Sequence, residues 1–238
     1  MAFFAGAVYL LRLPYWQIKK VEIGGLEILD PQEVRVKIDN FKSGLILFLL
    51  PRSSFLLFNS ESLASLLRQE FPRVESVLVR KVFPDSLEIK LKERELFGIF
   101  CNEECVYIDK QGFAYDYAPI SSGFLFIKIK SDAAEARVGS TVLEPDLMNE
   151  IVFLSSEVGK ISGIRAVGYE LFSKISSEIK METSEGFKIL FKRGDNFANA
   201  FRVLKTVLEQ EIKDKRAQLE YIDLRFGNKV FYRFRDSL

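Results

Sequence analysis

The stretch of this sequence best suited to chemistry is Cys101-Asn-Glu-Glu-Cys105, in which two adjacent carboxylates lie between two cysteines. Carboxylate pairs such as Glu103 and Glu104 can serve acid–base catalysis. These two lie in a predicted turn with no candidate nucleophile or cleft beside them. The chain also contains no His, the commonest general base and metal ligand. We therefore predict a solvated turn, no catalytic residues and no enzymatic activity.

The two cysteines allow two interpretations. If residues 102–104 form a three-residue hairpin loop, the sulfurs of Cys101 and Cys105 lie on facing strands within reach of a disulfide. Two reduced thiols in the core are the alternative, and a location outside the cytoplasm would favour the disulfide. Two thiols alone cannot form a four-ligand zinc site, and Gly24-Gly25 is not part of a phosphate-binding loop. The sequence predicts no metal and no cofactor.

The C-terminal stretch EYIDLRFGNKVFYRFRDSL, residues 220–238, predicts two strands joined at Gly227-Asn228. Side chains alternate between the two faces of each predicted strand. In the first strand Ile222, Leu224 and Phe226 share one face, and Tyr221, Asp223 and Arg225 share the other. In the second strand Val230, Tyr232 and Phe234 share one face, and Phe231, Arg233 and Arg235 share the other. An open edge strand offers unpaired backbone groups to an extended partner. Residues 236–238 are too few to fold back over this edge.

We predict that the last strand accepts a partner strand. The candidate binding residues are Arg225, Phe226, Val230, Phe231, Tyr232 and Arg233, with the arginines facing partner carboxylates and the aromatic rings filling apolar pockets. The alternative is that this hairpin is simply the rim of the core.

The elements that precede this hairpin predict an α+β protein. In residues 15–94 the order is strand, helix, helix, strand, strand. The expected core positions here are Ile18, Val21 and Ile23, then Val34, Ile38 and Phe41, then Leu63, Leu66, Leu67 and Phe71, then Val77, Val79, Leu87, Ile89 and Leu91. Asp30, and Asn59 or Ser60, cap the two helices. The apolar segment 44–58 is expected to be a flap on the sheet or a surface for lipid or a partner.

The remainder, residues 95–238, predicts mostly antiparallel strands with two helices. Turns are expected at residues 109–112 and 184–186. The helices present Leu147, Ile151, Leu154 and Val158, and, after an Asp195 cap, Phe197, Phe201, Leu204, Leu208 and Ile212. The charged sequence Lys92-Glu93-Arg94-Glu95 marks the expected domain break.

Charge and the N-terminal residues limit the classes of partner. Net charge is +1, from 34 basic and 33 acidic residues, so no bulk field attracts nucleic acid. Met1 to Leu11 is an uncharged apolar run, about half of what a membrane helix needs. We interpret residues 1–14 as a membrane-proximal segment whose helix is completed upstream; a membrane-grazing or core-packed segment is the alternative. Arg12, Lys19 and Lys20 would by themselves place this side in the cytoplasm.

Three motifs resemble one family in its order. The element order of residues 15–94, with FPRVESVLVRKVFPDSLEIKLKER, is similar to the polypeptide-transport-associated (POTRA) domain of the FtsQ/DivIB bacterial cell-division family. CVYIDKQGFAYDYAP, from Cys105, resembles the opening of that family's second domain, and EYIDLRFGNKVFYR resembles its terminal DLR strand segment. The similarity covers nearly all of residues 15–235. It implies a POTRA domain (β-α-α-β-β, 15–94) followed by a β domain (95–238).

The resemblance also implies a function. It implies a non-enzymatic adaptor with a single-pass anchor, most of the chain extracytoplasmic at the division septum, and no small-molecule substrate. The implied partners are the bitopic proteins FtsB and FtsL, the former at the terminal strand, in support of septal wall synthesis. The extracytoplasmic location overrules the positive-charge count. A POTRA-type module that chaperones polypeptides to an outer-membrane barrel is the alternative function; such a barrel would need many more alternating segments.

Overall fold

The computed structural model describes residues 14–46, 50–119, 125–132, 134–161, 163–171, 177–227 and 229–235. The chain divides into two compact units, one ending at Arg94 and the other beginning at Glu95. The first 13 residues, which include most of the expected membrane-proximal segment, lie outside the described residues. In the described parts, no helix combines the length and the apolar character needed to cross a bilayer.

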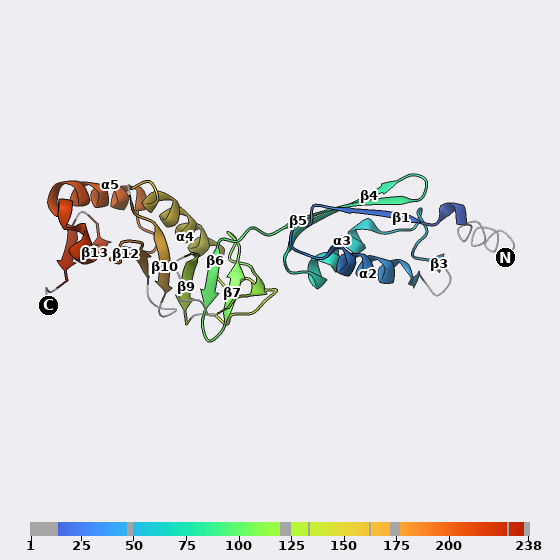
Figure 1. Ribbon diagram of the computed structural model, residues 1–238, viewed down its shortest axis with the longest axis horizontal. Helices are drawn as coiled ribbons and strands as arrows, with labels where there is room; N and C mark the ends of the chain where they lie inside the picture. Colours follow the sequence, from blue (N-terminus) through green and yellow to red (C-terminus); the bar gives the residue numbers. More distant parts are fainter. Residues whose placement is uncertain are drawn as a thin grey trace. The chain divides into compact units, whose positions relative to one another are not determined.

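The first unit packs two helices against a small sheet (Figure 1). Its elements are a 3-10 helix η1 (Pro14–Trp16), β1 (Lys20–Gly24), α2 (Pro31–Lys42), β2 (Leu45–Ile46), β3 (Leu50–Pro51), α3 (Ser60–Glu70), β4 (Val74–Val82) and β5 (Ser86–Glu93). The sheet order is β1-β5-β4, with β1 parallel and β4 antiparallel to β5. β2 and β3 form a separate antiparallel ribbon. The order of the main elements is the one that the sequence predicts.

Local sequence signals explain both helices of this unit. The Asp30 side chain accepts a hydrogen bond from the Gln32 N–H and Pro31 begins α2, while the Asn59 side chain accepts from the Ser62 N–H at the start of α3. The predicted apolar faces of α2 and α3 are buried or partly buried against the sheet, and Ala64 of α3 is also buried. Ile18 is buried but precedes β1, so the first strand is shorter than predicted.

Glu93 connects the end of β5 to the loop after β1. Its Oε1 accepts hydrogen bonds from the backbone N–H groups of Glu27, Ile28 and Leu29, at 2.9, 3.0 and 3.0 Å. Gly25 begins this loop with φ +85°, and a Cβ there would lie 2.0 Å from the Leu91 carbonyl oxygen. Only glycine fits so close to β5. The predicted charged break thus includes a residue that holds the first unit together.

The second unit is a sheet with two helices over one face (Figure 1). Its elements are β6 (Gly98–Cys101), β7 (Cys105–Ile108), β8 (Ala114–Tyr117), β9 (Ile127–Ser131), α4 (Pro145–Val158), β10 (Ala166–Leu171), β11 (Glu178–Thr183), β12 (Lys188–Lys192), α5 (Phe197–Val207), a π-helical turn η2 (Leu208–Ile212), a 3-10 helix η3 (Lys213–Gln218), β13 (Leu219–Phe226) and β14 (Lys229–Phe234). In the described residues nine strands pair in the order β14-β13-β12-β11-β10-β9-β6-β7-β8.

The sheet is mixed, with five antiparallel and three parallel pairings among the described strands. The prediction of an α+β fold with a mostly antiparallel second domain and two helices is therefore confirmed. The parallel pairs are β9 with β6 and β10, and β12 with β13. The segment that contains α4 connects β9 to β10, and the segment that contains α5 connects β12 to β13. Each is a crossover connection, which parallel neighbours need.

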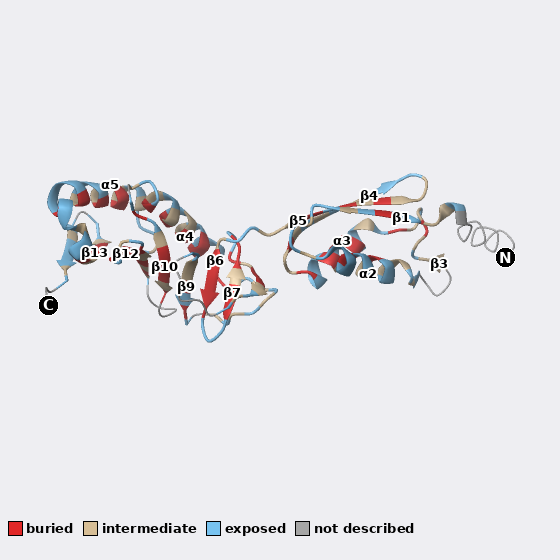
Figure 2. Cartoon of the chain, viewed as in Figure 1, coloured by how far each residue is buried: buried red, intermediate tan, exposed pale blue. Residues whose placement is uncertain are grey.

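The core of this unit lies between the sheet and the helices. Figure 2 shows the buried side of α4 and α5 turned toward the strands. The four predicted α4 positions are buried together with Met148, and Phe201, Leu204, Leu208 and Ile212 are buried in the second helical segment. The opposite face of the sheet carries many charged side chains, including Glu170, Lys180 and Lys188.

The cap of α5 differs from the prediction. Asn196, not Asp195, is the N-cap, and its side chain accepts from the Asn199 N–H at 3.0 Å. The cap must directly precede the first helical residue, Phe197, to reach the free N–H groups of the first turn. The Asp195 carboxylate instead accepts from the Asn196 N–H. The α-helix also ends at Val207, and the predicted last turn is π-helical.

Candidate partner-binding edge

β14 is an edge strand of the nine-stranded sheet. It pairs antiparallel with β13 on one side, and no described strand lies on its other side. Val230 and Phe234 are partly buried against the core cluster, which fixes the strand to the sheet. The unpaired backbone groups of the other side are therefore held in an extended, ordered conformation.

A β-bulge in β13 decides which side chains lie beside each other. Asp223 pairs with Phe231 and Phe226 pairs with Lys229, so two residues of β13 oppose the single residue Val230. The extra residue reverses the alternation, and Phe226 shares a face with Phe231 rather than with Ile222. The predicted alternation, which places Phe226 on the same face as Ile222 and Leu224, therefore stops at the bulge.

Aromatic side chains are exposed along this edge. Phe226 and Phe231 are 55% and 51% exposed, and their rings meet edge to face with centroids 5.4 Å apart. Tyr232 is 39% exposed and packs edge to face on Phe234 at 5.6 Å. Rigid aromatic groups at an open edge are the residue types that anchor protein interfaces.

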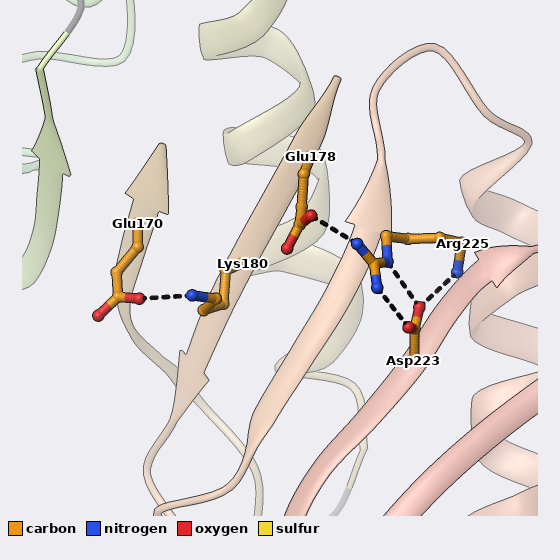
Figure 3. A network of polar contacts seen from close by, with 5 residues as sticks. All are labelled: Glu170, Glu178, Lys180, Asp223 and Arg225. Carbon is orange, nitrogen blue, oxygen red and sulfur yellow. Dashed lines mark hydrogen bonds and ion pairs between the residues drawn. The ribbon is translucent and has the colours of Figure 1, made fainter. Parts of the chain in front are cut away.

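The half-buried Arg225 side chain is bound by carboxylates of the same chain (Figure 3). Its guanidinium donates from Nε to Asp223 Oδ1 at 2.8 Å and from Nη2 to Asp223 Oδ2 at 2.6 Å, and from Nη1 to Glu178 Oε2 at 2.5 Å. The guanidinium carbon also lies 5.7 Å from the centroid of the Phe226 ring. Glu178 belongs to β11, so the side chain reaches across β12. Arg225 thereby positions the aromatic pair.

The ionisation of this network follows from its geometry. Burial by itself would raise the pKa of Asp223, but the hydrogen bonds from the Arg225 side chain and backbone, and its positive charge, hold that pKa below the usual range. The same contacts raise the pKa of Arg225. Glu170, farther along this face, is buried in part, and its pKa is nevertheless lowered by Lys180, whose Nζ lies 3.1 Å from Glu170 Oε2, and by Lys188. This face of the sheet is a set of paired charges.

Arg233 is the more accessible cation of the edge. It forms an ion pair with Glu220, Nε to Oε2 2.6 Å, in which the two side chains are 58% and 41% exposed. An exposed pair of this kind contributes little to stability. Arg233 can therefore exchange Glu220 for another carboxylate at small cost.

Comparison with known proteins bears on the identity of this chain. Residues 16–94 match the sequence profile of the FtsQ-type POTRA domain. Over 231 residues the chain is 24% identical to the cell division protein DivIB of Clostridium acetobutylicum, which covers 93% of this chain and 84% of that protein. Two DivIB proteins of Clostridium botulinum are 23% and 24% identical over the same shares. The chain belongs to the FtsQ/DivIB family.

The other predicted chemistry of this FtsQ/DivIB-family chain lies at the opposite end of the sheet. Cys101 and Cys105 face each other on β6 and β7 and form a disulfide, with an S–S distance of 2.08 Å and Cα atoms 4.2 Å apart. Glu103 and Glu104 occupy the exposed turn between them. Because β6 and β7 lie six and seven strands from β14, the disulfide and the edge are separate features.

All six predicted edge residues are exposed or half-buried side chains of β13 and β14, and Arg225 is bound by carboxylates of the same chain. The sequence analysis did not predict Asp223 and Glu178 as partners of Arg225, or Glu220 as the partner of Arg233. Asp223 and Glu220 could have been found, because they lie next to the arginines on the predicted hairpin. Glu178 could not, because it is 47 residues away and two strands across.

Proposed function

We propose that this protein is a non-enzymatic scaffold of the bacterial division apparatus that binds FtsB- and FtsL-type bitopic proteins and supports septal cell-wall synthesis. The relatives with which it shares almost its whole length are named cell division proteins. The observation that carries the binding proposal is the open edge of β14, flanked by the exposed pair Phe226 and Phe231.

On this proposal a partner segment adds to the sheet as a strand beside β14. Main-chain hydrogen bonds provide affinity, and side-chain contacts provide selectivity. Phe231 and Tyr232 contact apolar side chains of the partner, and Arg233 releases Glu220 to pair with a partner carboxylate. Arg225 stays with Asp223 and Glu178 and holds the Phe226 ring in place.

The proposal includes the topology of the chain in the cell. An N-terminal helix completed upstream of Met1 anchors the protein in the cell membrane by a single pass, and domains 15–94 and 95–238 lie outside the cytoplasm at the septum. The uncharged run from Met1 to Leu11 supports the anchor, because it supplies about half of a membrane-spanning length.

Amide hydrogen exchange of the chain with and without the FtsB segment of the same organism tests the binding mode. In an antiparallel ladder the N–H groups of consecutive residues point alternately toward and away from the neighbouring strand. Of Phe231 and Tyr232, one N–H is therefore free of β13, and a partner strand should slow its exchange. The amides of β8, the other edge, should not change. Binding without new protection in β14 would contradict strand addition.

Deletion of residues 230–238 gives a second test by calorimetry. We expect affinity for the FtsB segment to fall by on the order of 2 kcal/mol or more, about thirtyfold in Kd. Circular dichroism must show that the shortened protein is folded, because Val230 and Phe234 also contact the core. Unchanged affinity in a folded deletion would place the partner site elsewhere.

A further inference from the structure

A cluster of aromatic side chains lies at one end of the first unit, away from the edge described above. Tyr15 packs edge to face on Trp16, with ring centroids 5.1 Å apart. Trp16 lies 6.4 Å from Phe83, and Phe83 lies 6.0 Å from Phe55. The four rings come from three separate segments: η1, the loop after β3 and the β4–β5 turn.

Backbone hydrogen bonds tie these three segments together. The Phe55 N–H donates to the Trp16 carbonyl at 2.7 Å, and the Ile18 N–H donates to the Ser53 carbonyl at 2.8 Å. The Lys19 N–H donates to the Asp85 carbonyl at 2.8 Å. Figure 1 shows η1, β3 and the turn between β4 and β5 at the same end of the unit. The backbone of the fold therefore fixes the positions of the segments that carry these rings.

This surface is open to solvent. Tyr15 is 58% exposed and Phe83 is 64% exposed, and the exposed side chains of Leu56 and Val82 adjoin Phe55 and Phe83 in the sequence. Exposed apolar residues are normal when they are scattered singly, whereas a contiguous group marks an interaction site. We call Tyr15, Trp16, Phe55, Leu56, Val82 and Phe83 the aromatic end surface.

Basic residues surround the aromatic end surface. Lys19, Lys20, Arg52 and Lys81 are all exposed at this end. The Lys81 ammonium lies 5.4 Å from the centroid of the Phe55 ring and donates to the Phe55 carbonyl at 3.0 Å. The Asp85 carboxylate lies among them, 3.9 Å from the Lys19 ammonium. Trp and Tyr rings beside Lys and Arg are the residue types that occupy the boundary between lipid and water, and the cations favour anionic headgroups.

The chain itself indicates what covers this surface. Tyr15 and Trp16 lie just beyond the apolar run from Met1 to Leu11, with Arg12, Leu13 and Pro14 between, and the proposed function assigns that run to a membrane anchor. We propose that the aromatic end surface seats in the headgroup region of the bilayer, so that the first unit is held against the membrane and not merely tethered to it. This inference rests on the proposed anchor.

The single Trp of the chain, Trp16, provides the probe. The protein, with the segment upstream of Met1 that completes the proposed anchor, is reconstituted in vesicles of phosphatidylcholine and phosphatidylglycerol. The acyl chains are used with and without bromine, which quenches Trp emission on contact. Two variants move the probe: Trp16→Phe with Phe83→Trp places it on the surface but 67 residues from Trp16 in the sequence. Trp16→Phe with Ile28→Trp is the matched control.

Ile28 suits the control because it is 70% exposed and lies at the other end of the first unit. Its N–H bonds to Glu93 at the end of β5, whereas Lys20, near the aromatic end surface, pairs with Ser86 at the start of β5. We expect brominated lipid to reduce the emission of the Phe83→Trp protein about twofold and to leave the Ile28→Trp protein unchanged, since interfacial contacts reach only the outermost acyl region. Circular dichroism should show the native spectrum for both.

Three other outcomes would each overturn the seated surface. Quenching of Trp16 in the original chain without quenching in the Phe83→Trp protein would leave the anchor in place and overturn the seated surface. Absence of quenching in both the original chain and the Phe83→Trp protein would overturn both the anchor and the seated surface. Equal quenching in the Phe83→Trp and Ile28→Trp proteins would mean nonspecific adsorption and would also overturn the proposal. Loss of Phe83→Trp quenching in vesicles without phosphatidylglycerol would support the role of the lysines.

Discussion

The Phe226 ring meets the Phe231 ring edge to face across the last hairpin, with centroids 5.4 Å apart and an interplanar angle of 87°. This contact exists because the bulge in β13 moves Phe226 to the face that Phe231 occupies. The two rings form one apolar surface beside the open edge of β14, where a partner side chain can pack against both.

Replacing Phe231 with Lys should weaken binding of the FtsB segment by on the order of 2 kcal/mol, because a charge would replace an aromatic anchor. Phe231 is half exposed, so the fold should be retained. Isothermal titration calorimetry gives the affinity and circular dichroism checks the fold.

Tyr117→Lys is the matched control, because Tyr117 is an exposed aromatic residue at the end of β8, the opposite edge strand. This variant should bind normally, and a folded segment of residues 15–94 should not bind at all. Equal losses in Phe231→Lys and Tyr117→Lys, or none in either, would argue against a site on β14.

Replacing Arg225 with Gln should destabilise the second unit by about 1–3 kcal/mol at neutral pH, because the largely buried Asp223 carboxylate loses its ionic partner. Asp223 has a lowered pKa in the folded protein, so its contribution is present above its unfolded pKa of about 3.9 and is lost as pH falls through the folded value. The difference in free energy of unfolding between the original protein and Arg225→Gln should therefore shrink in acid. Urea titrations at several pH values measure it, and a difference independent of pH would refute this account.

Replacing Glu93 with Gln should lower the free energy of opening of the loop after β1 by about 1–2 kcal/mol, because three backbone N–H groups lose a charged acceptor. Burial acts to raise the pKa of Glu93, and the hydrogen bonds from Leu29, Ile28 and Glu27 outweigh it and lower that pKa. The effect should accordingly fade as pH falls below the unfolded pKa of about 4.3. Amide exchange of residues 27–29 reports the change.

The control for this variant is Glu95→Gln, since the Glu95 side chain is 74% exposed and its cation, Lys110, is 4.0 Å away. Glu95→Gln should leave exchange at residues 27–29 as it was. Comparable acceleration in both variants would mean that Glu93 has no special role.

Cys101 and Cys105 should be oxidised in protein isolated from its natural compartment, because they face each other across a short hairpin. Intact mass after alkylation under non-reducing conditions shows whether thiols remain; two alkylated thiols would refute the disulfide but not the scaffold proposal. Cys101→Ser with Cys105→Ser should lower stability by about 2 kcal/mol, as expected for so short a loop. Binding of the FtsB segment should be unaffected, because the edge lies at the other end of the sheet.

Local signals in the sequence determined the elements of this protein. The Asp30 and Asn59 caps, the turn at residues 109–112 and the alternation in β14 each depend on residues close together in the chain, so they can be read without tertiary structure. Motif order together with these elements was also sufficient for the family.

Only the tertiary structure decided how the edge is built. The strand order places β13 beside β12 in parallel, and no short-range pattern specifies a parallel neighbour. The bulge that turns Phe226 toward Phe231 arises from pairing between two strands, and Arg225 meets Glu178 only because β11 lies two strands away. The aromatic end surface likewise joins rings from three segments. Periodicity shows which residues share a face of one strand or helix, whereas contacts between distant segments depend on which elements pack together, and that depends on the free energy of the whole fold.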